Sequence, residues 1–123
     1  MTPIGPHPVV VEATLDYDSA LDTLCGARGF GTQPRMLLYK WGALTVDLHV
    51  WVRGHHSYSV HGQVIETAMH SPVVGAEASA GSEPVLTDRF GEFTVALGPE
   101  CRPHRLRVRT AIADVVCVLP EAA

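Results

Sequence analysis

The chain has 123 residues, which is the size of a single domain that can bury a hydrophobic core without disulfides or a metal. Hydrophobic residues make up 46% and charged residues 18% of it, so the composition is that of a globular domain and excludes a disordered chain. The formal charge of -4 argues against a protein that neutralises phosphates, and we expect no nucleic-acid partner.

Residues 1–35 are expected to form an N-terminal extension. Three prolines and a glycine among the first eight residues favour an extended arm. The pattern then predicts a strand over residues 9–17 and a short helix over residues 18–25. Asp18 or Ser19 is the expected N-cap of that helix, because both residue types accept hydrogen bonds from free backbone N–H groups.

Residues 36–120 show the period-two pattern of a β-sheet domain. From Leu44 to Val52, leucine and valine alternate with more polar residues. Glycine, proline, aspartate and serine interrupt this alternation at short intervals, which marks about seven strands and no long helix. The sequence therefore predicts an all-β fold, an antiparallel β-sandwich.

A glycine-containing loop predicts a pairing that brings two histidines together. With Arg53 opposite Ser57, His49 faces His61 across two neighbouring strands. These two imidazoles and the nearby Asp47 are ligand types that zinc accepts. A small zinc-binding protein is therefore one alternative function, and two solvated strand histidines without a metal are the other interpretation.

In the same register, Trp51 faces Ser59 on the side opposite the apolar stripe. An exposed tryptophan often marks a protein interface. Two interpretations stay open. Either residues 9–24 fold over this face and bury it, or Trp51, His49 and His61 form a docking surface.

Arginines at alternate positions predict a cationic stripe on the outer surface of one strand. They are Arg105, Arg107 and Arg109, preceded by Arg102. If Phe93 pairs with Val108, then Glu92 lies opposite Arg109. Exposed ion pairs contribute under about 1 kcal/mol each. The stripe is therefore either a solubilising surface or a binding surface for an acidic protein partner.

The stretch VLTDRFGEF predicts a tight hairpin turn. The Asp88 carboxylate can accept a hydrogen bond from a backbone N–H two residues on, and Gly91 can adopt a positive φ. Phe93 then points inward as the next strand begins. Each residue type is needed for the turn itself, so we expect Asp88 to be structural and not a general base.

Four stretches in order carry a resemblance to a known family: VHGQVIET, SPVVGAEASAG, LTDRFGEFTVALGP and HRLRVRT. Together they resemble the carboxypeptidase-regulatory-like domain, whose sequence motifs are a G-x-V strand, a P-x-x-G-A turn, a T-D-x-x-G-x-F hairpin and an L-x-V strand. The resemblance covers residues 57–119 and implies a Greek-key sandwich of the prealbumin-like (transthyretin-like) or immunoglobulin-like type. The matching positions are Gly62, Val64, Pro72, Gly75, Ala76, Thr87, Asp88, Gly91, Phe93, Leu106 and Val108.

The resemblance implies a non-catalytic recognition module. With the preceding RMLLYKWGALTVDLHVWV, the chain is also similar to small actinobacterial proteins of this class encoded near sigma-factor genes. A sigma factor or a signalling protein is the partner that this resemblance implies. The prealbumin fold includes one enzyme, the 5-hydroxyisourate hydrolase, but its Tyr-Arg-Gly-Ser tail is missing from the C-terminal CVLPEAA.

Cysteine usage and hydropathy indicate where the protein works. The three cysteines, Cys25, Cys101 and Cys117, are odd in number and widely spaced, which predicts reduced buried thiols instead of a disulfide framework. No apolar stretch approaches the roughly 20 residues of a membrane span. The N-terminus MTPIGPHPVVVEA lacks the pattern of a signal peptide. We expect a bacterial, cytoplasmic protein that does not associate with membranes.

The sequence as a whole favours a non-catalytic protein-interaction or regulatory module without a cofactor. The alternatives are the zinc-binding protein described above and a carbohydrate-binding accessory domain. A homodimer that pairs through an edge strand is compatible with the predicted sandwich.

Overall fold

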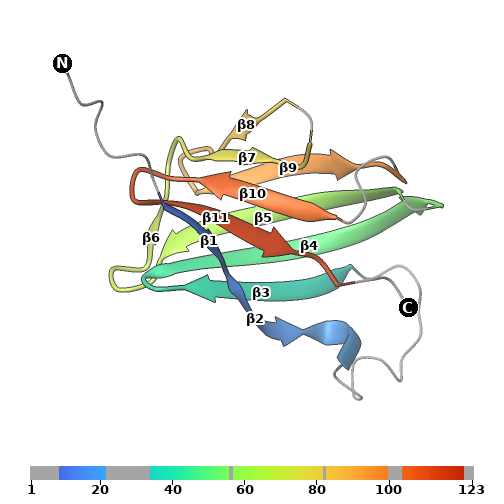
Figure 1. The fold of residues 1–123 in the computed structure, drawn as a ribbon, viewed down its shortest axis with the longest axis horizontal. Coiled ribbons are helices and arrows are strands. Elements are labelled where there is room, and N and C mark those ends of the chain that lie inside the picture. Colours follow the sequence, from blue (N-terminus) through green and yellow to red (C-terminus); the bar gives the residue numbers. More distant parts are fainter. Residues whose placement is uncertain (1–8, 22–33, 56, 82, 100–103, 121–123) are drawn as a thin grey trace.

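The computed structural model describes residues 9–21, 34–55, 57–81, 83–99 and 104–120. Its strands form two sheets packed face to face, which confirms the predicted β-sandwich (Figure 1). The strands are β1 (Val9–Glu12), β2 (Thr14–Asp18), β3 (Arg35–Trp41), β4 (Leu44–Gly54), β5 (Ser57–Glu66), β6 (Ser71–Pro72), β7 (Glu77–Ser79), β8 (Val85–Leu86), β9 (Glu92–Leu97), β10 (Arg105–Arg109) and β11 (Ala113–Val118).

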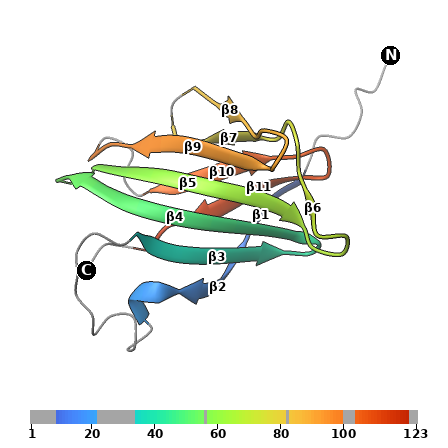
Figure 2. The same ribbon diagram turned by 180° about the vertical axis from the view of Figure 1, so that it is seen from behind.

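Sheet A has the order β1-β11-β10-β7-β8, and sheet B has the order β2-β3-β4-β5-β6, with β9 also paired to β5 (Figure 2). Among the described residues the strands number eleven and not seven, because the chain changes sheets repeatedly and because β6 and β8 have only two residues each. In the part of the chain that the structure describes, no helix is long and apolar enough to cross a membrane.

The predicted alternation produces the core between the two sheets. Leu44, Val46 and Leu48 on β4 are at most 2% exposed, whereas the residues between them are half-buried on the outer face. Burying such side chains is the main stabilising contribution to a fold of this kind. Tyr39 of sheet B also lies in this core, and its hydroxyl donates a hydrogen bond of 2.7 Å to the Val118 carbonyl of sheet A.

Residues 9–18 are part of the sandwich. The strand predicted over residues 9–17 is two strands that meet at Ala13, where the chain passes from sheet A to sheet B. β1 runs parallel to β11, so this edge of sheet A departs from the antiparallel pairing of the predicted sandwich. The helix predicted over residues 18–25 is a 3₁₀ turn over Ser19–Leu21, and residues 22–25 lie outside the described residues.

The pairing of β4 with β5 brings His49 opposite His61, as predicted, and also places Trp51 opposite Ser59. The predicted pair of Arg53 with Ser57 is wrong. Ser57 lies opposite Gly54, because the register shifts after Val52 and leaves Arg53 as the extra residue of a bulge.

The predicted pairing of Phe93 with Val108, and of Glu92 with Arg109, is also wrong. β9 pairs with β5, so Phe93 lies opposite Gly62, whereas β10 lies in the other sheet between β11 and β7. Alternation marks both strands as half-buried but does not indicate which sheet each one joins. Gly62 supplies the specific fit: a Cβ atom there would lie 2.2 Å from Cζ of Phe93.

The TDRFG turn has the predicted local geometry. Oδ1 of Asp88 accepts hydrogen bonds from the backbone N–H of Phe90 at 2.8 Å and of Glu92 at 2.9 Å, and Gly91 has φ of 74°. The turn is not a β-hairpin, however, because β8 belongs to sheet A and β9 to sheet B. Asp88 therefore turns the chain from one sheet to the other.

A buried threonine fastens this crossing to the preceding turn. Oγ1 of Thr87 donates to the Val73 carbonyl at 2.6 Å and accepts from the Ala76 N–H at 2.9 Å. Gly91 packs closely as well, since a Cβ atom there would lie 2.4 Å from the Val64 carbonyl oxygen. The motif residues of this region therefore make contacts that fix how β5, β6 and β9 meet.

Gly62→Ala is expected to lower the free energy of unfolding by about 1 to 3 kcal/mol, because the added methyl group overpacks the Phe93 ring and Leu48. Urea unfolding at pH 7 measures this change. Gly54→Ala is the matched control, since a Cβ atom there would meet its nearest neighbour at 3.9 Å. Equal stability of the two variants would contradict the close fit of β9 on β5.

Candidate functional site

Three arginines of β10 lie on the outer surface of sheet A. Leu106 and Val108 of the same strand are 0% exposed and face the core, so Arg105, Arg107 and Arg109 face outward, as the alternation predicts. The side chains of Arg107 and Arg109 are 47% and 53% exposed, so both can contact another molecule. Arg102 lies outside the described residues.

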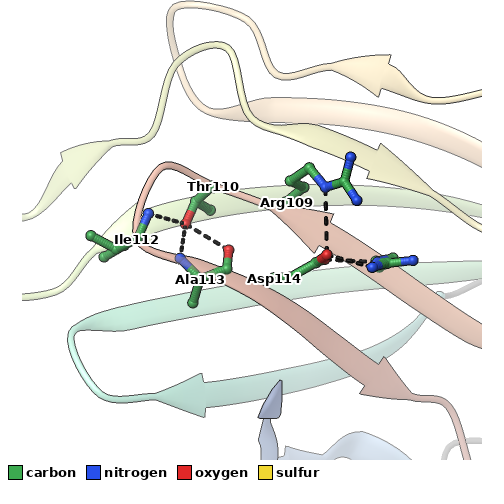
Figure 3. A network of polar contacts seen from close by, with 6 residues as sticks. Arg109, Thr110, Ile112, Ala113 and Asp114 are labelled. Carbon is green, nitrogen blue, oxygen red and sulfur yellow. Dashed lines mark hydrogen bonds and ion pairs between the residues drawn. The ribbon is translucent and has the colours of Figure 1, made fainter. Parts of the chain in front are cut away.

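A buried carboxylate holds two of these guanidinium groups (Figure 3). Asp114 lies on β11 opposite Arg109, and its side chain is only 3% exposed. Its Oδ1 accepts a hydrogen bond of 2.8 Å from Nε of Arg107, and its Oδ2 accepts one from Nη2 of the same side chain. Nε of Arg109 lies 3.4 Å from Oδ2.

The electrostatics follow from this geometry. The hydrogen bond from Arg107 lowers the pKa of Asp114 below its usual value, and the charges of Arg107 and Arg109 act in the same direction, against the opposing effect of burial. The same hydrogen bond raises the pKa of Arg107. These contacts keep the Asp114 carboxylate charged. They also restrict the orientation of the Arg107 and Arg109 side chains.

The turn between β10 and β11 sets this register (Figure 3). Oγ1 of Thr110 donates to the Ala113 carbonyl at 2.9 Å and accepts from the N–H groups of Ile112 at 3.2 Å and Ala113 at 3.1 Å. The Thr110 N–H also donates to the Ala113 carbonyl at 2.8 Å. This closed turn places Arg109 and Asp114 directly opposite each other.

A shallow hollow of about 170 Å³ lies beside the arginines, over β7 and β10. Ser79 of β7 pairs with Arg107, and Glu77 pairs with Arg109. The hollow is lined by Glu77, Ser79, Pro84, Arg107 and Arg109. Two oriented guanidinium groups and a hydroxyl are donors that suit a carboxylate or another oxyanion. Glu77 makes one end of the hollow less favourable for an anion.

We call the outer surface formed by Arg105, Arg107, Arg109 and this hollow the arginine face. The sequence predicted the arginines but missed Asp114, which orients them. The available signal was an isolated acidic residue in the apolar stretch IADVVCV. A charged residue in such a strand is rarely buried unless it is paired.

The two predicted histidines lie on the outer face of sheet B. Nδ1 of His61 lies 3.1 Å from Oγ1 of Thr94, and its Nε2 lies 3.7 Å from Oε1 of Glu92. Nε2 of His49 lies 3.9 Å from Oδ1 of Asp47. Within the described ranges, no group of three or more histidine, cysteine, aspartate or glutamate residues is placed to hold a metal ion.

Trp51 lies on the same face and is half-buried. The guanidinium carbon of Arg53 lies 5.9 Å from the centre of its ring, a cation–π arrangement. Of the two interpretations, cover by residues 9–24 is not provided by the described part of that segment, since β1 and β2 add edge strands beside β11 and β3.

A second buried carboxylate has a structural role. The side chain of Asp18 is 3% exposed and accepts hydrogen bonds from Arg35, at 2.9 Å from Nε and 2.6 Å from Nη2. It also accepts one of 3.0 Å from the Ala20 N–H, so it caps the 3₁₀ turn. The hydrogen bond from Arg35 lowers the pKa of Asp18. This pair joins the end of β2 to the start of β3.

Cys117 is a free, buried thiol, as predicted, and burial raises its pKa to about 12, which keeps it protonated and unreactive. Cys25 and Cys101 lie outside the described residues.

In comparisons with known proteins, no protein-family model, no curated protein and no solved structure matches the chain.

The stability of the protein is expected to fall as the pH is lowered below about 5, where unfolded aspartate begins to bind protons. The pKa values of Asp18 and Asp114 are lowered in the folded state, so the unfolded chain binds more protons in this range. Urea unfolding between pH 7 and pH 2.5 measures the effect. Asp18→Asn should be less stable at pH 7 and lose less stability on acidification, and an identical acid slope would contradict the assignment.

Proposed function

We propose that this protein is a non-catalytic protein-binding module that docks an acidic partner on the arginine face of sheet A. One observation carries the proposal. Asp114, with a side chain only 3% exposed, contacts the guanidinium groups of Arg107 and Arg109, whose side chains are about half exposed in the described part of the chain. This arrangement costs the desolvation of a carboxylate, and it uses only two of the five N–H donors of Arg107 and one of Arg109.

Arginine side chains that are already oriented before the partner binds increase the affinity. A free surface arginine loses rotamer freedom when it binds, at a cost of about 0.5 to 1.5 kcal/mol per side chain. The hydrogen bonds to Asp114 restrict Arg107 and Arg109 in the unbound protein, so less freedom is lost on binding. Arginine is also suited to carboxylates, because its planar fork can donate two parallel hydrogen bonds.

The resemblance to carboxypeptidase-regulatory-like domains supports a recognition role of this kind. Several of its motif residues have structural contacts: Gly62 makes room for Phe93, Thr87 joins two turns, and Gly91 has a positive φ. A motif of this type specifies a fold and not a reaction. By the same resemblance, we propose a sigma factor or a signalling protein of the bacterial cytoplasm as the partner.

A labelled twelve-residue glutamate peptide is expected to bind the full-length protein at low salt and to dissociate as salt is added. Fluorescence anisotropy measures this binding. Because the formal charge of the protein is -4, attraction to an acidic peptide must come from a local surface and not from the total charge. A twelve-residue lysine peptide that binds more tightly than the glutamate peptide would contradict the proposal.

Arg105→Glu is expected to weaken binding of the glutamate peptide about tenfold, since the change removes an attraction and adds a repulsion. Arg105 is exposed and lies two residues from Arg107, so its replacement leaves the Asp114 hydrogen bonds in place. Lys40→Glu makes the same change of charge on sheet B and is the matched control. Equal affinities of the two variants would place the binding surface elsewhere.

A further inference from the structure

We infer that the partner segment is an extended strand with acidic side chains at alternate positions, lying along β10 over the arginine face. This inference rests on the proposed function and adds the conformation and spacing of the partner. It follows from the spacing of the arginines, the size of the hollow and the distribution of charge around it.

The spacing of the arginines matches an extended chain. Arg105, Arg107 and Arg109 occupy alternate positions of one strand, which places successive side chains about 7 Å apart. Alternate residues of an extended partner have the same spacing and also face the same side. Acidic side chains four residues apart on a helix are separated by about 6 Å, so their mismatch with the arginines grows by about 1 Å per step along the row.

The size of the hollow agrees with this conformation. About 170 Å³ accommodates one side chain, whereas a helix about 10 Å wide needs a long groove. The hollow lies between the outward side chains of β7 and β10, where Ser79 stands opposite Arg107. A carboxylate over this pair can accept hydrogen bonds from the guanidinium group and from the hydroxyl.

The donors that remain on Arg107 point to the same ligand. A guanidinium group has five N–H donors, and Asp114 accepts one from Nε and one from Nη2 of Arg107. Three donors are left, on Nη1 and Nη2, and these two nitrogens form the end of the fork. This end can bind a second carboxylate bidentately, so Arg107 would lie between the buried carboxylate of Asp114 and an acidic side chain of the partner.

Charge also gives the partner a direction. Arg109 lies between two acidic residues, Glu77 on β7 and Asp114 on β11. The residues opposite Arg107 are Ser79 and Val116, and the residue opposite Arg105 on β11 is Val118. An acidic side chain is therefore favoured over Arg105 and Arg107 and disfavoured near Glu77. The partner segment is expected to carry two acidic residues, separated by one residue, over the Arg105 end of β10.

Three labelled peptides of equal length, each with four glutamates among threonines or alanines, test the inference against the full-length protein. In the first the glutamates alternate with threonine, in the second they are contiguous, and in the third they are four residues apart in an alanine-rich helix. The alternating peptide is expected to bind at least about fivefold more tightly than the others in fluorescence anisotropy at low salt.

Two variants show where along β10 the peptide binds. Arg105→Gln should remove the preference for the alternating peptide, whereas Glu77→Gln should keep it and increase the affinity for a peptide with four alternating glutamates. Equal affinities of the three peptides, all reduced by Arg105→Glu, would overturn the extended register and leave the proposed function standing. Tighter binding of the helical peptide would overturn the strand conformation. No binding of any peptide would overturn both proposals.

Discussion

The buried carboxylate of Asp114 is the interaction on which the arginine face depends. A charge removed from water is costly unless it is paired and hydrogen-bonded, and here Arg107 satisfies both oxygens while Arg109 contributes further. The same contacts restrict two surface arginines that would otherwise sample many rotamers. A stabilising contact within sheet A thereby becomes a means of orienting groups toward solvent.

The sandwich provides the conditions for this contact. Alternation along β10 directs Leu106 and Val108 into the core, so the arginines between them must face outward. The Thr110 turn then fixes the register that puts Asp114 opposite Arg109. Asp18 with Arg35 shows the same chemistry at an edge of sheet B, where the guanidinium group is less exposed and the pair joins two strands.

Sequence patterns predicted much of the fold because burial of a sheet face imposes a period of two. That period located the core residues of β4 and the outward arginines of β10, and the turn residues Asp88 and Gly91 were predicted from their local hydrogen bonding and φ. The predicted partner strand of β9 was wrong, because the alternation of buried and exposed residues is the same in either sheet. The apolar stretch around Asp114 indicated a paired acidic residue, but its arginine partners depend on the pairing of β10 with β11, which the local sequence does not encode.

Binding of the twelve-residue glutamate peptide to Asp114→Asn tests the central claim most directly. The substitution removes a negative charge from beneath Arg107 and Arg109, so charge alone predicts tighter binding of an acidic ligand. Loss of the carboxylate also releases the guanidinium groups of Arg107 and Arg109. If their orientation by Asp114 determines the affinity, binding becomes about fivefold weaker. Weaker binding by a variant with an unchanged circular dichroism spectrum would support the account, and tighter binding would contradict it.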